Sequence, residues 1–398
     1  MVDTANTLER CSAKARLGRM RSSSLRIVAV AICRHALSAH AQHAACGEFM
    51  LKGHVRSCAL VCACWLAVAT GAASIAPAAA SEVNVYSYRE EKLIAPLLRA
   101  FHVATGIRVN ATFASQGLVE RVASEGEKSP ADVLWTTDLG PLLEARRRDL
   151  TQAFRSSIVE ANVPAIYRDP ENHWIGVTLR ARIFVVSVDR IGTQVVTYEQ
   201  LAEPQWKGKV CMRSGAHAYN VGLVASMLAH HGAERTEGWL RGVAANLARK
   251  PAGGDRDQIR AVIAGACDVA VVNSYYVADF IPLDQNLREQ KRSPIRVLFP
   301  NATDRGTHVS LSGAALLKHG PNRDSSIRLI EFLASEQGQR IFSAVNDEYP
   351  VNEGVPPPSL MASWGPLKAD PLSLHRIAGL LVDAQNLVEK ARFDHGPE

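Results

Sequence analysis

The sequence lacks the short motifs that mark several common kinds of enzyme. It contains no G-x-S-x-G nucleophile elbow, no H-E-x-x-H zinc helix, no G-x-x-x-x-G-K-[ST] phosphate loop and no G-x-G-x-x-G after a strand. Serine hydrolases, zinc proteases and nucleotide-binding enzymes are therefore not indicated. We expect the protein not to be an enzyme, and a secreted hydrolase with an unrelated active site is the distant alternative.

The sequence beyond residue 80 also lacks an excess of charge of either sign. Residues 1 to 80 carry nine of the 45 Lys and Arg residues and three of the 39 Asp and Glu residues, which leaves 36 of each sign. A formally neutral chain gives no reason to expect binding to nucleic acid or to an anionic membrane surface.

The segment 50–80 has the three regions of a secretory signal peptide. A positive region runs from Lys52 to Arg56, an apolar stretch follows at 59–73, and small residues at 78–80 form an A-x-A cleavage pattern. We expect cleavage there and a periplasmic protein, with an uncleaved membrane anchor as the alternative. Residues 1–49 are rich in arginine and patternless, and we expect them to be a non-native upstream extension or disordered.

Cysteine is scarce beyond the signal segment. Six of the eight cysteines lie before residue 80, so only Cys211 and Cys267 remain. In an oxidising compartment an isolated pair is typical of a disulfide rather than a metal site, and two buried free thiols are the alternative.

The periodicity of apolar residues predicts an α/β protein. The first 55 residues after the signal segment alternate strand, helix, strand, helix and strand, which implies parallel strands with helical crossovers. About 318 residues exceed what one core usually holds, so two domains are expected. The predicted strands are 83–88, 107–113, 131–135, 183–189, 208–212, 267–273 and a pair within 306–318. The predicted helices cover 94–105, 118–122, 221–230, the region near Trp239, 325–345 and 374–392.

Several charged residues are interpreted as structural or solvated. His230 and His231 fall at the end of a predicted helix, where imidazoles commonly interact with free carbonyl groups. Asp132, Asp138 and the pair in D-R-D at 255–257 are expected to be solvated loop charges rather than paired catalytic carboxylates.

Three tyrosines are the strongest indication of a ligand. Tyr275 and Tyr276 are adjacent, and Tyr219 lies upstream. A phenolate is an oxygen donor with a reference pKa of about 10, so it suits a metal acidic enough to displace its proton, and Fe(III) is the obvious candidate. Aromatic packing at the end of a strand is the alternative. Adjacent residues in a regular strand point to opposite faces, so a shared metal requires the strand before them to end near Asn273.

The runs VNVYSYRE, SPADVLWTTD, WKGKVCMRSGAHAYN, GDRDQIRAVIAGACDVAVVNSYY, GTHVSLSGAAL and EYPVN resemble the periplasmic ferric-iron-binding proteins of ABC importers. The resemblance covers essentially the whole chain after residue 81. It implies a two-lobed class II periplasmic binding protein fold with hinge strands between the lobes. It places 81–183 and 306–352 in the first lobe, and 184–305 and 353–398 in the second.

The same resemblance implies a carrier that binds Fe(III) in the cleft between the lobes and delivers it to an importer permease in the inner membrane. We expect it to act as a monomer. Tyr219, Tyr275 and Tyr276 match the tyrosine ligands of the family. In the first lobe this sequence departs from the family pattern, because Glu90 stands where many relatives have histidine. Glu90 and Tyr88 are therefore candidate ligands, with capping of the first helix as the alternative.

An arginine is expected to hold carbonate or another small anion beside the metal. Arg180 is the candidate and Arg182 lies close by, with a salt bridge at the hinge as the alternative for either. The main competing function is a binding protein of the same fold for an organic or inorganic anion, held by Arg180, Ser214 and backbone donors at a helix N-terminus.

Overall fold

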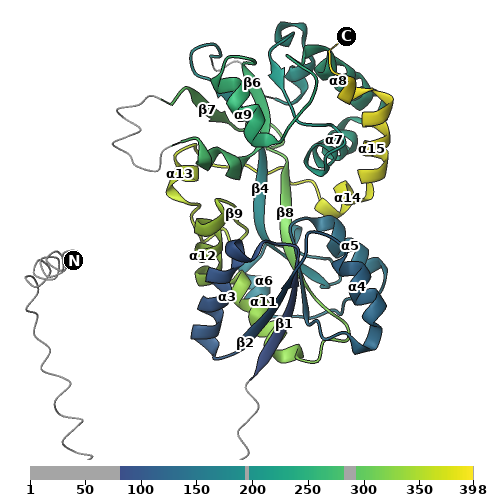
Figure 1. Cartoon of the computed structure of the whole chain (residues 1–398), viewed down its shortest axis with the longest axis vertical. Helices are drawn as coiled ribbons and strands as arrows, with labels where there is room; N and C mark the ends of the chain where they lie inside the picture. The colour runs from purple at the N-terminus through teal and green to yellow at the C-terminus, as the bar shows by residue number, and fades with distance from the viewer. Residues whose placement is uncertain (1–80, 193–196, 282–292, 398) are drawn as a thin grey trace, which may run out of the picture. The chain divides into compact units, whose positions relative to one another are not determined.

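The computed structural model describes residues 81–192, 197–281 and 293–397. They lie within one compact unit, residues 77–398, in which helices pack around two β-sheets that share one strand (Figure 1). The predicted signal segment and the extension before it lie outside the described residues. Among the helices that are described, none is both long enough and apolar enough to cross a membrane.

The first sheet contains the parallel strands that the start of the sequence predicts. β1 (Glu82–Ser87) pairs in parallel with both β2 (Arg108–Phe113) and β3 (Val133–Thr136). The short strand β9 (Tyr349–Pro350) lies at the other end of this sheet. The helices of this lobe are α3 (Glu91–Thr105), α4 (Leu118–Glu125), α5 (Leu139–Arg147), α6 (Ser157–Asn162), α11 (Arg323–Ala334) and α12 (Glu336–Asn346).

Helix α3 shows how local sequence places the first loop of the site. Ile94, Leu97 and Phe101 recur at helical spacing and are buried. Gly106 ends the helix with φ 72°, a left-handed conformation that favours glycine. The loop between β1 and α3, which carries Tyr88 and Glu90, is therefore held by elements buried on both sides.

The second sheet is smaller and contains β5 (Val210–Cys211), β6 (Val269–Asn273) and β7 (Ile295–Leu298). Cys211 of β5 forms a disulfide with Cys267, which precedes β6, across a sequence separation of 56 residues. The helices of this lobe are α7 (Ala218–His231), α8 (Ala233–Asn246), α9 (Asp255–Ile263), α14 (Leu374–Gly379) and α15 (Leu381–Lys390), and α13 (Ser359–Ala362) lies before α14.

Two strands cross between the lobes. The first part of β4 (Trp174–Ser187) pairs with β8 (Val309–Leu316), and the part from Arg182 onward pairs with β6 and β7. β8 also pairs with β3, so both strands enter the first sheet. The predicted strand at 183–189 is too short, because β4 begins nine residues earlier. The predicted pair of strands within 306–318 is wrong, because one strand fills that segment.

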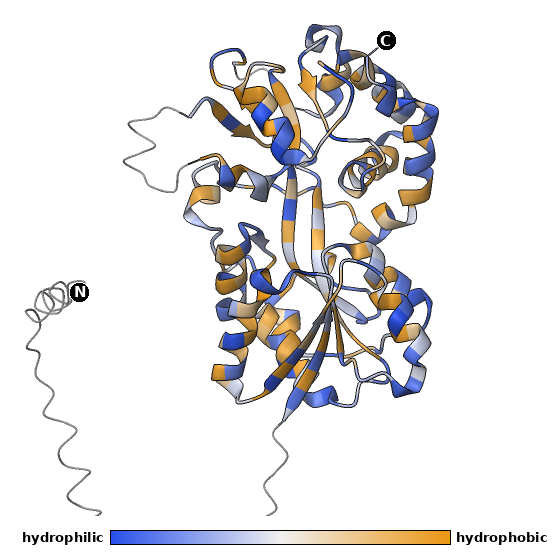
Figure 2. Ribbon diagram, in the orientation of Figure 1, coloured by the Kyte–Doolittle hydropathy of each residue, from blue (hydrophilic) through white to orange (hydrophobic). Residues whose placement is uncertain are grey.

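The hydropathy pattern agrees with this arrangement. Hydrophobic residues follow the sheets and the inner faces of the helices in both lobes, whereas hydrophilic residues gather on the outer faces (Figure 2). β4 is an exception, because it carries hydrophilic residues between the lobes although all 14 of its residues are buried. Two of them are Arg180 and Arg182, and their charges need partners inside the protein.

Two predicted long helices are interrupted. The predicted helix 325–345 divides at Ser335, whose hydroxyl accepts a hydrogen bond from the Gly338 amide and starts α12. A β-carbon at Gly338 would collide with the carbonyl oxygen of Phe332, so glycine permits the close turn. The predicted helix 374–392 likewise divides at Leu380, between α14 and α15.

Candidate metal centre

Tyr275 and Tyr276 lie where the chain leaves the second sheet. β6 ends at Asn273, as the sequence predicts, and the 3-10 helix η5 (Ser274–Asp279) follows at once. Successive residues in a 3-10 helix are rotated by about 120° rather than the 180° of a strand. The two rings therefore lie against each other, with centroids 4.2 Å apart at 41°.

Tyr219 reaches the same place from the N-terminus of α7. Its amide donates a hydrogen bond to Nδ1 of His217, the N-cap residue of that helix, at 3.2 Å. Its phenol oxygen lies 3.0 Å from that of Tyr275. All three tyrosines line a cavity of about 430 Å³ between the two lobes. The structure thus brings together the three side chains that the sequence singles out.

The surroundings keep the phenols of Tyr275 and Tyr276 protonated in the empty protein. Burial raises the pKa of Tyr275 well above its ordinary value of 10, and a negative charge on Tyr219 would raise it further, whereas Arg180 lowers it. Burial also raises the pKa of Tyr276. A cation of low charge would have to compete with these firmly held protons, so the cluster favours a strongly acidic metal ion.

Arg180 lines the cavity beside the tyrosines. Its guanidinium forms an ion pair with Asp138 at 2.9 Å and donates to the carbonyl oxygen of Thr137. Burial works against its charge, but Asp138 and Glu348 raise the pKa of Arg180 above the ordinary value for arginine. The guanidinium carbon lies 5.9 Å from the centre of the Tyr219 ring. A permanent positive charge therefore stands at the wall of the cavity.

Arg182 is placed differently and does not line the cavity. It lies behind the tyrosines, where it forms an ion pair with Asp255 at 2.6 Å and donates to Asn220 Oδ1 at 2.6 Å. Asn220 follows Tyr219. Asp255 in turn accepts a hydrogen bond from the amide of Asn273, two residues before Tyr275, at 2.7 Å. One buried ion pair thus braces both segments that carry the phenols.

The interpretation of Asp255 and Asp132 as solvated loop charges is wrong. Asp255 begins α9 and is 1% exposed. Asp132 is fully buried and accepts hydrogen bonds from the amides of Asn84 and Asn322, each at 2.7 Å. Backbone donors and an arginine replace water for these carboxylates. Their partners are distant in sequence, so no local pattern reveals them.

The first lobe contributes Tyr88 and Glu90 to the same cavity. The Tyr88 hydroxyl accepts a hydrogen bond from the amide of Val119, near the start of α4, at 3.1 Å. Glu90 occupies the N-cap position of α3 but makes no capping hydrogen bond, and it pairs instead with Lys92 at 2.8 Å. Its side chain is 68% exposed, so it can turn toward a ligand at low cost.

Further charged residues of the cavity are not identified from the sequence. The guanidinium carbon of Arg256, in α9, lies 4.5 Å from the centre of the Tyr276 ring, and the guanidinium forms an ion pair with Asp279. Glu348 binds both terminal nitrogens of Arg89 at 2.8 Å and fixes the loop after β1. Asp347 is the remaining carboxylate of the lining. In the part of the chain that the structure describes, no group of three or more His, Cys, Asp or Glu side chains could hold a metal ion.

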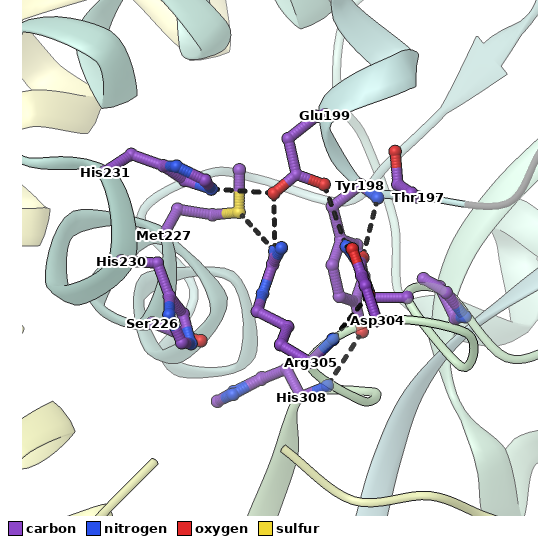
Figure 3. A network of polar contacts seen from close by, with 12 residues as sticks. Thr197, Tyr198, Glu199, Ser226, Met227, His230, His231, Asp304, Arg305 and His308 are labelled. Carbon is purple, nitrogen blue, oxygen red and sulfur yellow. Dashed lines mark hydrogen bonds and ion pairs between the residues drawn. The ribbon is translucent and has the colours of Figure 1, made fainter. Parts of the chain in front are cut away.

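Two other predicted features lie away from this cavity. Ser214, named for the competing anion-binding function, donates its hydroxyl hydrogen bond to Asp394 at 2.6 Å and does not line the cavity. His230 and His231 end α7, but the expectation that they interact with free carbonyl groups is wrong. Their Nε2 atoms lie 2.7 Å from carboxylates of Asp370 and Glu199, respectively, and Figure 3 shows His231, Glu199 and Arg305 in one network.

The comparison with known proteins decides the family. Residues 83–344 match the model of the bacterial extracellular solute-binding proteins. The chain belongs to this family. Among the relatives of this solute-binding protein is iron uptake protein A2 of Synechocystis sp., which is 40% identical over 322 residues, covering 79% of this chain and 91% of the relative.

Solved structures of ferric-binding proteins share the fold. The ferric binding protein of Bordetella is 46% identical and superposes with a TM-score of 0.74, covering 79% of this chain and all of the other. A Trichodesmium protein in complex with iron and citrate ligands is 37% identical, with a TM-score of 0.73 and coverage of 78% and 99%. The two-lobed class II periplasmic binding protein fold is therefore confirmed.

Proposed function

We propose that this solute-binding protein captures ferric iron through the phenolate oxygens of Tyr219, Tyr275 and Tyr276. The observation that carries the proposal is the convergence of these three side chains on one cavity, with two of the phenol oxygens 3.0 Å apart. Aromatic packing alone would not require the oxygens to meet. The names of the relatives, which include iron uptake and ferric-binding proteins, support the same cargo.

The charge balance of the cavity supports a trivalent ion. Three phenolates cancel three positive charges, which a buried Fe(III) ion requires because an uncompensated charge is very costly inside a protein. Tyr275 and Tyr276 release their protons only to a strongly acidic metal, since burial raises the pKa of both. Hard oxygen donors also match ferric iron better than the soft metals that thiolates prefer.

The remaining coordination positions are assigned to the first lobe and to a small anion. Glu90 and Tyr88 line the same cavity from the first lobe. Closure of the lobes on the ion would bring their oxygens within coordination distance of it. Arg180 would hold carbonate or another anion beside the metal, because its guanidinium is buried at the wall and always charged. The citrate bound with iron in the Trichodesmium relative is consistent with an anion at such a site.

The transport context follows from the same proposal. Residues 50–80 act as a signal peptide that is cleaved before Ser81, and the released protein binds iron in the periplasm as a monomer. Residues 81–183 with 306–352 form the first lobe, and 184–305 with 353–398 form the second. The closed, loaded form then presents a surface that an ABC importer permease in the inner membrane distinguishes from the open form.

A titration with ferric citrate tests the proposal directly. The purified protein should develop the visible absorption band of iron bound to phenolate, with a stoichiometry of one. The competing anion-binding function predicts a colourless protein whose melting temperature rises with phosphate or a sulfonate instead. A hydrolase predicts turnover of an ester or phosphoester panel, and either of these results without the absorption band would refute the iron proposal.

A further inference from the structure

A second cavity lies on the other side of the crossing strands. It has a volume of about 570 Å³ and is bounded by α5 of the first lobe, by α7, α14 and α15 of the second, and by residues 308–311 of the β8 segment. In Figure 1 these helices lie on the opposite side of β4 and β8 from α12 and α9, which border the tyrosine cavity. Its volume is within the range of about 300 to 1,000 Å³ that is typical of sites for small molecules.

The walls of this cavity are mainly aliphatic. Val382 of the lining is apolar although it is 73% exposed, and the exposed Asn386 lies one turn further along α15. The acidic group of the lining, Asp138, is already paired with Arg180. A charged ligand would thus find no free counter-ion among the described residues of the lining. Aliphatic contacts would come from Leu139, Pro141, Val221, Leu311, Ile377 and Leu381.

His308 supplies the cavity with an imidazole that makes no side-chain hydrogen bond within the described part of the chain. It lines the cavity and is 4% exposed. Its Nδ1 is buried without a hydrogen-bond partner among the described residues, whereas its Nε2 lies beside Gly222, another residue of the lining, 3.4 Å from where a β-carbon of that glycine would stand. Its backbone amide donates to the Tyr198 hydroxyl at 3.2 Å, which holds the residue in place (Figure 3). Burial lowers the pKa of His308 to about 4, so the ring is neutral at physiological pH. A neutral imidazole can both donate and accept, and leaving it unpaired is costly.

We propose that this second cavity binds a small, uncharged, mainly apolar molecule with one hydrogen-bonding group, such as a phenol or an alcohol, which His308 recognises. The aliphatic walls supply the binding energy through burial of apolar surface. The imidazole selects a ligand with a hydroxyl group over a hydrocarbon of the same shape. Binding of such a molecule does not require iron to be present.

The probes are 2-naphthol and naphthalene, which differ by one hydroxyl group, and the measurement is equilibrium binding to the iron-free protein by fluorescence. We expect saturable binding with one site and a preference for 2-naphthol. Ala378→Phe places a ring in the cavity from α14 and should weaken binding at least about tenfold. Ala233→Phe adds the same ring at an exposed position of α8 and should change the affinity by less than about twofold.

His308→Leu tests the recognition of the hydroxyl group. This variant should bind both probes with equal affinity, because the hydrogen-bonding group is gone while an apolar side chain remains. The tyrosine double variant Tyr275→Phe, Tyr276→Phe should bind 2-naphthol like the wild type, so failure of the iron proposal leaves this result unaffected. Absence of saturable binding, or equal binding by Ala378→Phe and wild type, would overturn the proposal.

Discussion

The phenol oxygens of Tyr219 and Tyr275 lie 3.0 Å apart although 56 residues separate them in the chain. One comes from the first turn of α7 and the other from the 3-10 turn after β6. In the empty protein the pair shares a hydrogen bond, and a metal ion between the oxygens would replace the proton that now lies there. Under the proposed function, the empty site is therefore electrically neutral before iron binds.

Replacement of Tyr275 and Tyr276 by Phe should abolish iron binding. Loss of outer-shell partners of a metal typically costs about 10- to 100-fold in affinity, so loss of two direct ligands should exceed about a thousandfold. Stability of the empty protein should change by only about 1 kcal/mol, since one neutral hydrogen bond is lost. Tyr349→Phe is the matched control, because its buried hydroxyl has no hydrogen-bond partner among the described residues. Undiminished absorption in the double variant would contradict the site.

Iron affinity should fall as the pH drops. Each phenol must lose a proton to bind the metal, so the logarithm of the affinity should rise by up to about three per pH unit between pH 5 and 8. The stability of the empty protein should change at alkaline pH instead. The folded pKa of Tyr275 lies above the unfolded value of 10, so its contribution to stability is present below pH 10 and is lost as the pH rises through the folded pKa. Titration at constant free citrate, with thermal melts from pH 8 to 11, measures both.

Asp255→Asn should weaken both the fold and the iron site. Its carboxylate is buried with Arg182 and also accepts from the Asn273 amide, and removing one partner of a buried pair typically costs about 3 to 5 kcal/mol. The iron absorption should shift as well, because the pair positions Tyr219 and Tyr275. Asp324→Asn is the control, an exposed aspartate in the first turn of α11. If both variants melt alike and bind iron alike, the bracing role is wrong.

Breaking the disulfide should lower stability without removing the site. Cys211 and Cys267 are buried in the second lobe, and loss of a native disulfide typically costs about 2 to 4 kcal/mol. The Cys211→Ala, Cys267→Ala variant should therefore unfold at lower denaturant concentration and still give the iron absorption band. Equal unfolding midpoints for this variant and the oxidised wild type would show that the bridge contributes nothing.

The features predicted well from sequence are those that depend on near neighbours. The spacing of Ile94, Leu97 and Phe101 predicts α3, and the requirement that Tyr275 and Tyr276 share a face predicts the end of β6. The features predicted badly depend on partners far along the chain. From the sequence, Asp132 is indistinguishable from a solvated loop residue. Only the folded structure shows that it accepts hydrogen bonds from the amides of Asn84 and Asn322. The division of the predicted helix at Ser335 is a local exception, because it depends on the close contact between Gly338 and Phe332, which the periodicity of apolar residues does not reveal.

The path of the chain has a consequence for synthesis. β8 lies between β3 and β4 in the first sheet, so a ribosome that has completed β4 has not yet made the strand that joins β4 to that sheet. Residues 309–316 must emerge from the ribosome before β3 and β4 can form their hydrogen bonds to β8. A nascent chain of this kind stays incomplete until most of it has been translated, which would suit a polypeptide that has to be threaded through a translocase before it folds.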